Sequence, residues 1–149
     1  FTRLASGMRM ILRRSSRPIL VVKRQISPMN HLLLLFDGSP KSREALFLAN
    51  YLAKRYDRKL SVLVIEEDTE RGKTLFEEAR ESLGEGFGEI LLRKGNGVPA
   101  ETIFKTVLEI NADLILMGGY GLSPLLEVIF GSMVDDVLRR THIPVIVCQ

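Results

Sequence analysis

Apolar and polar residues follow two alternating patterns from His31 onward. Short continuous apolar runs, typical of strands buried on both faces, alternate with longer stretches in which apolar residues recur at helical spacing. The first run, HLLLLFD, ends at Asp37, and the next stretch begins with Ser39 as a helix cap and Pro40 at the first helical position. The predicted strands cover 31–37, 59–66, 87–95, 112–119 and 143–149, and the predicted helices begin at Pro40, Thr69, Pro99 and Ser132.

This alternation predicts an α/β fold with a parallel sheet, right-handed crossovers and helices on both faces. In such folds ligands bind beyond the carboxyl ends of the strands, where the strand order reverses. Asp37 lies at that end of the first strand of this sheet, and Gly118–Gly121 lie at that end of the fourth. We therefore expect these two segments to border one site.

The first 30 residues do not fit a single alternating domain. The segment LRRSSRPILVV, Leu12 to Val22, matches LRRTHIPVIVC, Leu138 to Cys148, at a constant offset of 126 residues. An offset near one domain length indicates a tandem duplication, although two helix–turn–strand segments can also match by chance. We expect residues 1–30 to be the helix-strand remnant of a preceding repeat with a linker, and residues 31–149 to be a second domain.

Composition and charge narrow the class of protein. The chain has 149 residues, of which 46% are hydrophobic and 26% charged, as in one ordinary globular domain. No apolar run is long enough to span a membrane, and the single cysteine, Cys148, fits a reducing cytoplasm. The seven charged residues among the first 30 are all basic, but no aromatic residues are interleaved with them beyond Phe1. A solvated helix face explains them better than nucleic acid, so we expect a cytoplasmic protein that binds neither nucleic acid nor membrane.

The segment MGGYGLSPLLEVIFGS, Met117 to Ser132, contains G-x-x-G, nine further residues and then Gly-Ser. Glycines after a strand permit positive φ and close approach of a ligand, and successive amides in such turns can hold an anion. Ser132 opens a predicted helix whose dipole favours anions, and its hydroxyl can bond a phosphate or simply cap the helix. The sequence has neither a Walker A motif nor a Rossmann glycine motif, and neither histidine has a ligand partner at metal-binding spacing.

This spaced glycine motif, together with FDGSPKSREAL and GVPAETIFKTVLEINADLILMG, resembles the ATP-binding branch of the universal stress protein family. The similarity covers Asn30–Gln149. It implies a doubly wound parallel five-stranded sheet of order 3-2-1-4-5, here with an extra N-terminal helix and strand. The resemblance also implies a nucleotide site with Asp37 at the ribose or adenine, Ile65 at the adenine, Gly118, Tyr120 and Gly121 along the phosphates, and Gly131, Ser132 and Met133 on their other side.

The implied ligand is ATP, AMP or ADP, and Mg²⁺ or Mn²⁺ would arrive with the nucleotide. Tyr120 and Leu122 stand where many relatives have a basic residue, so we expect AMP or ADP to bind nearly as well as ATP. Acidic residues that follow the second strand are expected to repel phosphates; they are Glu66, Glu67, Asp68 and Glu70. No nucleophile–base pair is evident and no lysine lies in the glycine segment, so we expect a ligand-responsive stress protein with little or no turnover.

The alternative interpretation is a structural dimerisation module that binds no nucleotide. An apolar last strand at a sheet edge invites pairing, and members of the resembled family pair this strand antiparallel with its counterpart in another copy. Pro18–Lys23 is such a counterpart on the same chain. We expect it to pair with Ile143–Cys148 of this chain or of a second copy, giving a tandem-domain pair or a homodimer.

Overall fold

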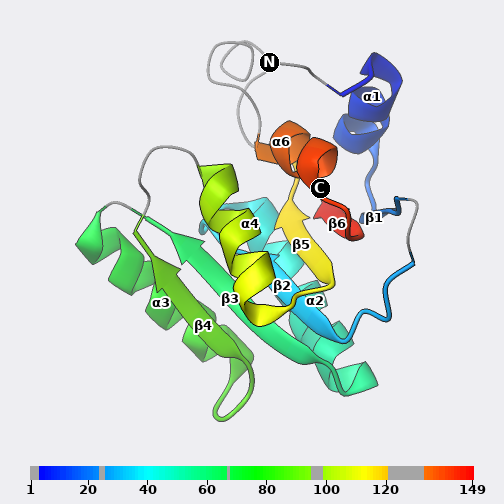
Figure 1. The fold of residues 1–149 in the computed structure, drawn as a ribbon. Coiled ribbons are helices and arrows are strands. Elements are labelled where there is room, and N and C mark those ends of the chain that lie inside the picture. The colour runs from blue at the N-terminus through cyan, green and yellow to red at the C-terminus, as the bar shows by residue number, and fades with distance from the viewer. Residues whose placement is uncertain (1–3, 24–25, 67, 95–98, 121–132) are drawn as a thin grey trace.

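The computed structural model describes residues 4–23, 26–66, 68–94, 99–120 and 133–149. Figure 1 shows a central sheet with helices on both faces and the N-terminal helix beside the last one. In chain order the elements are α1 (Ser6–Arg14), β1 (Ile19–Val21), β2 (His31–Leu35), α2 (Pro40–Tyr56), β3 (Lys59–Ile65), α3 (Thr69–Leu83), β4 (Glu89–Arg93), α4 (Pro99–Ile110), β5 (Leu114–Gly118), α6 (Met133–Arg140) and β6 (Val145–Cys148).

The sheet has the predicted doubly wound order. Its six strands lie in the order β1-β6-β5-β2-β3-β4, and all pairs except β1–β6 are parallel. The central strand β2 pairs with β3 on one side and with β5 on the other, so that Leu34 lies between Val62 and Leu116. The strand order therefore reverses between β2 and β5, and their carboxyl ends form the switch point at which such folds bind ligands.

The extra strand β1 covers the outer edge of β6. The two strands are antiparallel, with Leu20 opposite Ile146 and Ile19 opposite Val147. This confirms the predicted pairing of the N-terminal strand with the last strand, and it occurs within one chain. Both strands are shorter than predicted: β1 starts after Pro18 and β6 starts after Pro144.

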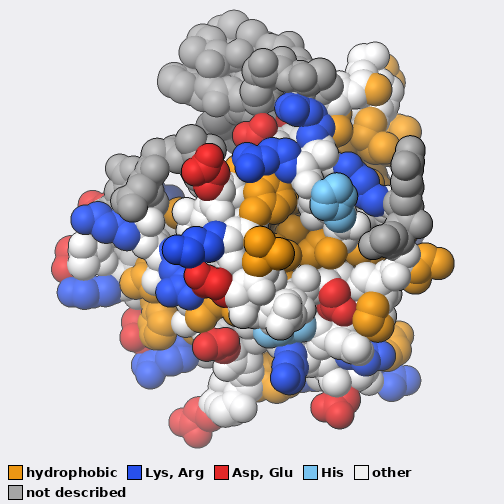
Figure 2. All heavy atoms as spheres, viewed as in Figure 1, with side chains coloured by type: hydrophobic (Ala, Val, Ile, Leu, Met, Phe, Trp, Pro, Cys, Tyr) orange, Lys and Arg blue, Asp and Glu red, His pale blue; other side chains and the backbone are white. Residues whose placement is uncertain are grey.

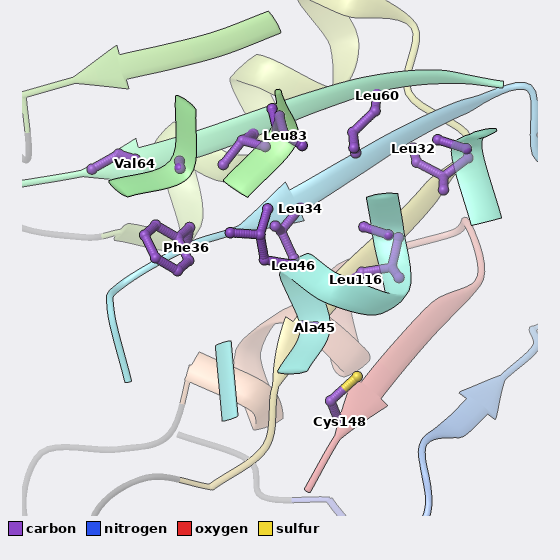
Figure 3. Packing of buried hydrophobic residues seen from close by; sticks show 14 of the residues in the cluster. Leu32, Leu34, Phe36, Ala45, Leu46, Leu60, Val64, Leu83, Leu116 and Cys148 are labelled. Atoms are coloured by element: carbon purple, nitrogen blue, oxygen red, sulfur yellow. The ribbon is translucent and has the colours of Figure 1, made fainter. Parts of the chain in front are cut away.

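Side chains that alternate along β2 divide the core into two clusters. Leu32 and Leu34 face α2 and α3, and Figure 3 shows Leu34 beside Leu46 of α2. Leu33 points to the opposite face, which α4 and α6 cover. Leu12 of α1 is fully buried in this second cluster, so the N-terminal helix is part of the same core. Figure 2 shows basic and acidic side chains interspersed on the face that α4 and α6 cover.

Candidate functional site

Asp37 lies just beyond the carboxyl end of β2, next to the switch point. The main-chain N–H of Ser39 donates to its carboxylate at 2.9 Å, and Asp37 is exposed. Burial of part of the carboxyl group opposes ionisation, but hydrogen bonds from Ser39 and Ser42 outweigh it, so the pKa of Asp37 is lowered. The site thus holds an ionised acceptor that can bond ligand hydroxyl or amino groups.

Lys41 brings a positive charge to the glycine segment. It is the second residue of α2, and its Nζ donates to the main-chain oxygen of Tyr120 at 2.5 Å. The two residues are 79 positions apart in the sequence. Because lysine was sought only within the glycine segment, sequence reasoning missed this contact. The available signal was its position in the first turn of the helix after β2, which the topology places at the switch point.

Gly118 and Gly119 serve packing rather than an unusual backbone conformation. Neither has the positive φ that glycine permits. A Cβ on Gly118 would lie 2.9 Å from the main-chain nitrogen of Ser42, because α2 begins directly against β5. The amide of Gly119 already donates to the carbonyl of Cys148 at 2.6 Å. The Gly119 amide is therefore already used within the sheet and is not free for a phosphate.

Tyr120 turns its side chain away from Lys41 and toward the first and last helices. The residue is 4% exposed, and its hydroxyl donates to Asp135 of α6 at 2.6 Å. The guanidinium carbons of Arg9 and Arg13, both on α1, lie 5.6 and 4.2 Å from the ring centroid. Burial raises the pKa of Tyr120, and the neighbouring Asp135 carboxylate raises it further.

Ile65 ends β3 and is partly buried, two strands from the glycine segment. Glu66 and Asp68, which follow it, contact Arg71 of α3, and Glu67 lies outside the described residues. Arg71 Nε lies 2.8 Å from Glu66, and the Arg71 amide donates to Asp68, which caps α3. The Arg71 side chain also reaches the main-chain oxygen of Asp37 at 3.5 Å. The Arg71 cation therefore offsets part of the acidic charge that follows β3.

Met133 opens α6 and is 38% exposed. Gly121, Gly131 and Ser132 lie outside the described residues. The structure thus brings Asp37, Gly118 and the Tyr120 main chain together through Lys41 and Ser42, and it links Tyr120 to the first turn of α6 through Asp135. Within the described ranges, no three His, Cys, Asp or Glu side chains gather as a metal site, and no helix is long and apolar enough to cross a membrane.

Sequence comparison relates the chain to universal stress proteins. A model of the universal stress protein family matches residues 29–149. Universal stress protein Slr1230 of Synechocystis is 28% identical over 152 residues, which cover 96% of this chain and 50% of that protein. Universal stress protein YxiE of Bacillus subtilis is 27% identical over 146 residues, which cover 80% of this chain and 99% of that protein.

Solved structures agree with the sequence comparison. A universal stress protein from Archaeoglobus fulgidus superposes with a TM-score of 0.80 and 27% identity, over 95% of this chain and 52% of that one. A universal stress protein in complex with cAMP gives a TM-score of 0.67 and 25% identity, over 80% of this chain and 96% of that one. The chain thus spans about half the length of Slr1230 and of the Archaeoglobus protein.

Proposed function

The chain belongs to the universal stress protein family, and on that premise we propose that it binds an adenine nucleotide at the β2–β5 switch point. The proposed ligand is ATP, ADP or AMP, and Mg²⁺ or Mn²⁺ would accompany the phosphates. Binding would alter the contacts of this domain with its partners in the cytoplasm, with little or no turnover. A structural relative that was solved with cAMP is consistent with a ligand of this class.

The position of Lys41 carries the proposal. Its ammonium group lies at the start of the glycine segment, 2.5 Å from the Tyr120 carbonyl, at the end of the sheet where α/β folds bind ligands. It supplies the cation that the glycine segment itself lacks, which favours phosphate groups there. The side-chain amide of Gln149, next to Gly119, has no hydrogen-bond partner among the described residues although its N and O atoms are buried.

Asp37 and Lys41 would act on different parts of the ligand. The ionised Asp37 carboxylate would accept hydrogen bonds from ribose hydroxyls or the adenine amino group, and Ile65 would contact the base. Lys41 would face the phosphates, together with the segment that contains Gly118, Tyr120 and Gly121. Gly131, Ser132 and Met133 would hold the other side of the phosphates.

Calorimetric titration with AMP and with ATP plus Mg²⁺ tests this division of roles. Asp37→Asn should weaken both ligands to a similar degree, because both contain the nucleoside. Lys41→Met should weaken ATP by about tenfold, the worth of one charge-assisted contact, and AMP by less. Lys59→Met makes the same charge change at the opposite end of the sheet and should leave both affinities unchanged.

A chain that takes up no adenine nucleotide at millimolar concentration would rule the proposal out. Equal losses for AMP and ATP in Lys41→Met would instead contradict the role given to Lys41. Gly131→Val, which puts a branched side chain where the proposal needs close approach of phosphate, should abolish binding. Incubation with ATP and metal, followed by assay for ADP, tests whether turnover is slow or absent.

A further inference from the structure

An approximate two-fold axis passes between β1 and β6 and relates the two copies of the internal repeat. At the offset of 126 residues, Leu20 is the equivalent of Ile146, and these two residues are paired. Ile19 pairs with Val147, which is the equivalent of Val21. Such reciprocal pairing is the mark of a two-fold interface, in which the same surface lies on both sides. The helices α1 and α6, side by side in Figure 1, are equivalent elements of that interface.

Arg9 and Asp135 are equivalent positions by the same offset, and they face each other. Arg9 Nε lies 3.7 Å from Asp135 Oδ2, and the carboxylate side chain is 1% exposed. The same position of the two repeats therefore meets across the two-fold axis. It is a base, Arg9, in the first repeat and an acid, Asp135, in the second. Tyr120 holds the second carboxylate oxygen, so Asp135 is fixed in this orientation.

A second copy of the β6–α6 edge would not find this complementarity. If it took the place of α1 and β1, its own Asp135 would occupy the position of Arg9. Two buried carboxylates would then face each other where the structure has an ion pair, and like charges at a buried site are strongly unfavourable. Apolar contacts do not distinguish the α1–β1 segment from a second β6–α6 edge. The buried Leu12, for example, is equivalent to Leu138, which is also a leucine.

We propose that the Arg9–Asp135 pair makes the β6–α6 edge specific for the α1–β1 segment, residues 4–23, and excludes pairing of two β6–α6 edges. Apolar burial supplies the affinity of this interface. The Arg9–Asp135 pair, which lies at the same position of both repeats, selects the partner. The interface thus favours association of two different repeats over a homodimer of one. This inference concerns the sheet edge and does not rest on nucleotide binding.

Disulfide trapping in the full chain tests the proposal. In a Cys148→Ser background, Leu20→Cys and Ile146→Cys place two thiols on paired strands, within reach of an intrachain disulfide. Arg9→Asp should slow formation of that disulfide by about tenfold, because two carboxylates then face each other. Arg14→Asp makes the same charge change at an exposed position of α1 and should leave the rate unchanged.

Charge repair separates electrostatic choice from simple packing. Asp135→Asn in the Arg9→Asp chain removes the second carboxylate but keeps an oxygen for Tyr120, so the rate should return to near that of the parent. An unchanged rate in Arg9→Asp, or no recovery with Asp135→Asn, would overturn the proposal. If Arg9→Asp does not fold, Arg9→Gln takes its place. It should slow formation of the disulfide by a smaller factor, and adding Asp135→Asn should reduce that slowing.

A chain with Ile146→Cys as its only cysteine tests exclusion of the homodimer. Because position 146 lies on the axis, two paired β6 edges would place these thiols side by side and form a covalent dimer under mild oxidation. In the Arg9→Asp chain α1 and β1 should leave the β6 edge more often, and the chain should still remain monomeric, because Asp135 would meet Asp135. A covalent dimer in that chain would show that the edge accepts its own copy and that the proposal is wrong.

Discussion

Tyr120 joins two parts of the molecule through opposite ends of one residue. Its main-chain oxygen accepts from Lys41 at the proposed nucleotide site, while its hydroxyl donates to Asp135 beneath the N-terminal helix. The pKa of this tyrosine is raised by burial and then by the Asp135 carboxylate, so the neutral form is favoured in the folded chain. The position is therefore sensitive both to substitution and to high pH.

Tyr120→Phe should reveal this coupling in the pH dependence of stability. At pH 8 the variant should be less stable by about 1.5–3 kcal/mol, because Asp135 loses a hydrogen bond. A raised folded-state pKa means that the stabilisation is complete below the unfolded value near 10 and is lost as pH rises above it. The free energies of unfolding in urea of the two proteins should therefore converge above pH 10. A gap that stays constant or widens there would contradict the raised pKa.

The start of α2 is the element that organises the proposed site. Ser39 caps it by accepting from the Ser42 amide at 3.2 Å, and Pro40 occupies the first turn. The following residues rest on β5: Ser42 is 2% exposed, and its main-chain nitrogen fills the space above Gly118. One helix start therefore positions Asp37 through Ser39 and carries Lys41 to the glycine segment.

Ser39→Ala should lower the free energy of unfolding by about 1 kcal/mol, because it removes a capping oxygen. The main-chain N–H that bonds Asp37 is kept, so the loss reports on the helix end rather than on the carboxylate. Ser39→Thr, which retains a hydroxyl at the cap, is the matched control and should lose clearly less. Urea denaturation followed by circular dichroism measures both, and an equal loss in the two variants would exclude a capping role.

The sequence predicted the type and order of these elements because each carries local signals. HLLLLFD is a continuous apolar run, and Ser39-Pro40 is a helix start that needs no tertiary information. The contacts that make the site are different in kind. No periodicity relates Lys41 to Tyr120 or Tyr120 to Asp135, and the repeat offset of 126 residues relates Arg9 to Asp135 without showing that they touch. Gly118 was expected from the sequence to lie along the phosphates, which stays a prediction; the contact that the structure shows for it, with α2, depends on the assembled sheet.

At the scale of the whole molecule, α1 and β1 are integral to one core. Leu12 is fully buried in the cluster that contains Val137 and Val145, and β1 continues the sheet beyond β6. The basic charge of the N-terminal segment, which alone suggested a solvated helix face, is partly used inside the molecule by Arg9 and Arg13 at Tyr120. The segment therefore contributes to the stability of the domain that it covers.

Leu12→Ala should lower the free energy of unfolding by about 2–5 kcal/mol, the usual cost of such a cavity. Ile11→Ala on the same helix is the matched control, because Ile11 is 58% exposed; its loss should stay below about 1 kcal/mol. Chemical denaturation of the two variants measures this difference. Similar small losses would show that α1 unfolds separately from the rest of the chain.

The antiparallel strand β1 also decides where the sheet can grow. Because β1 covers the edge of β6, the only parallel strand left at an edge of the described sheet is β4. That strand is only five residues long and begins and ends with charged residues, Glu89 and Arg93. Short charged edges are poor templates for further strands. The other edge of the described sheet is β1 itself, which is only three residues long. Both edges are therefore short, which disfavours the addition of further molecules edge to edge into a fibre.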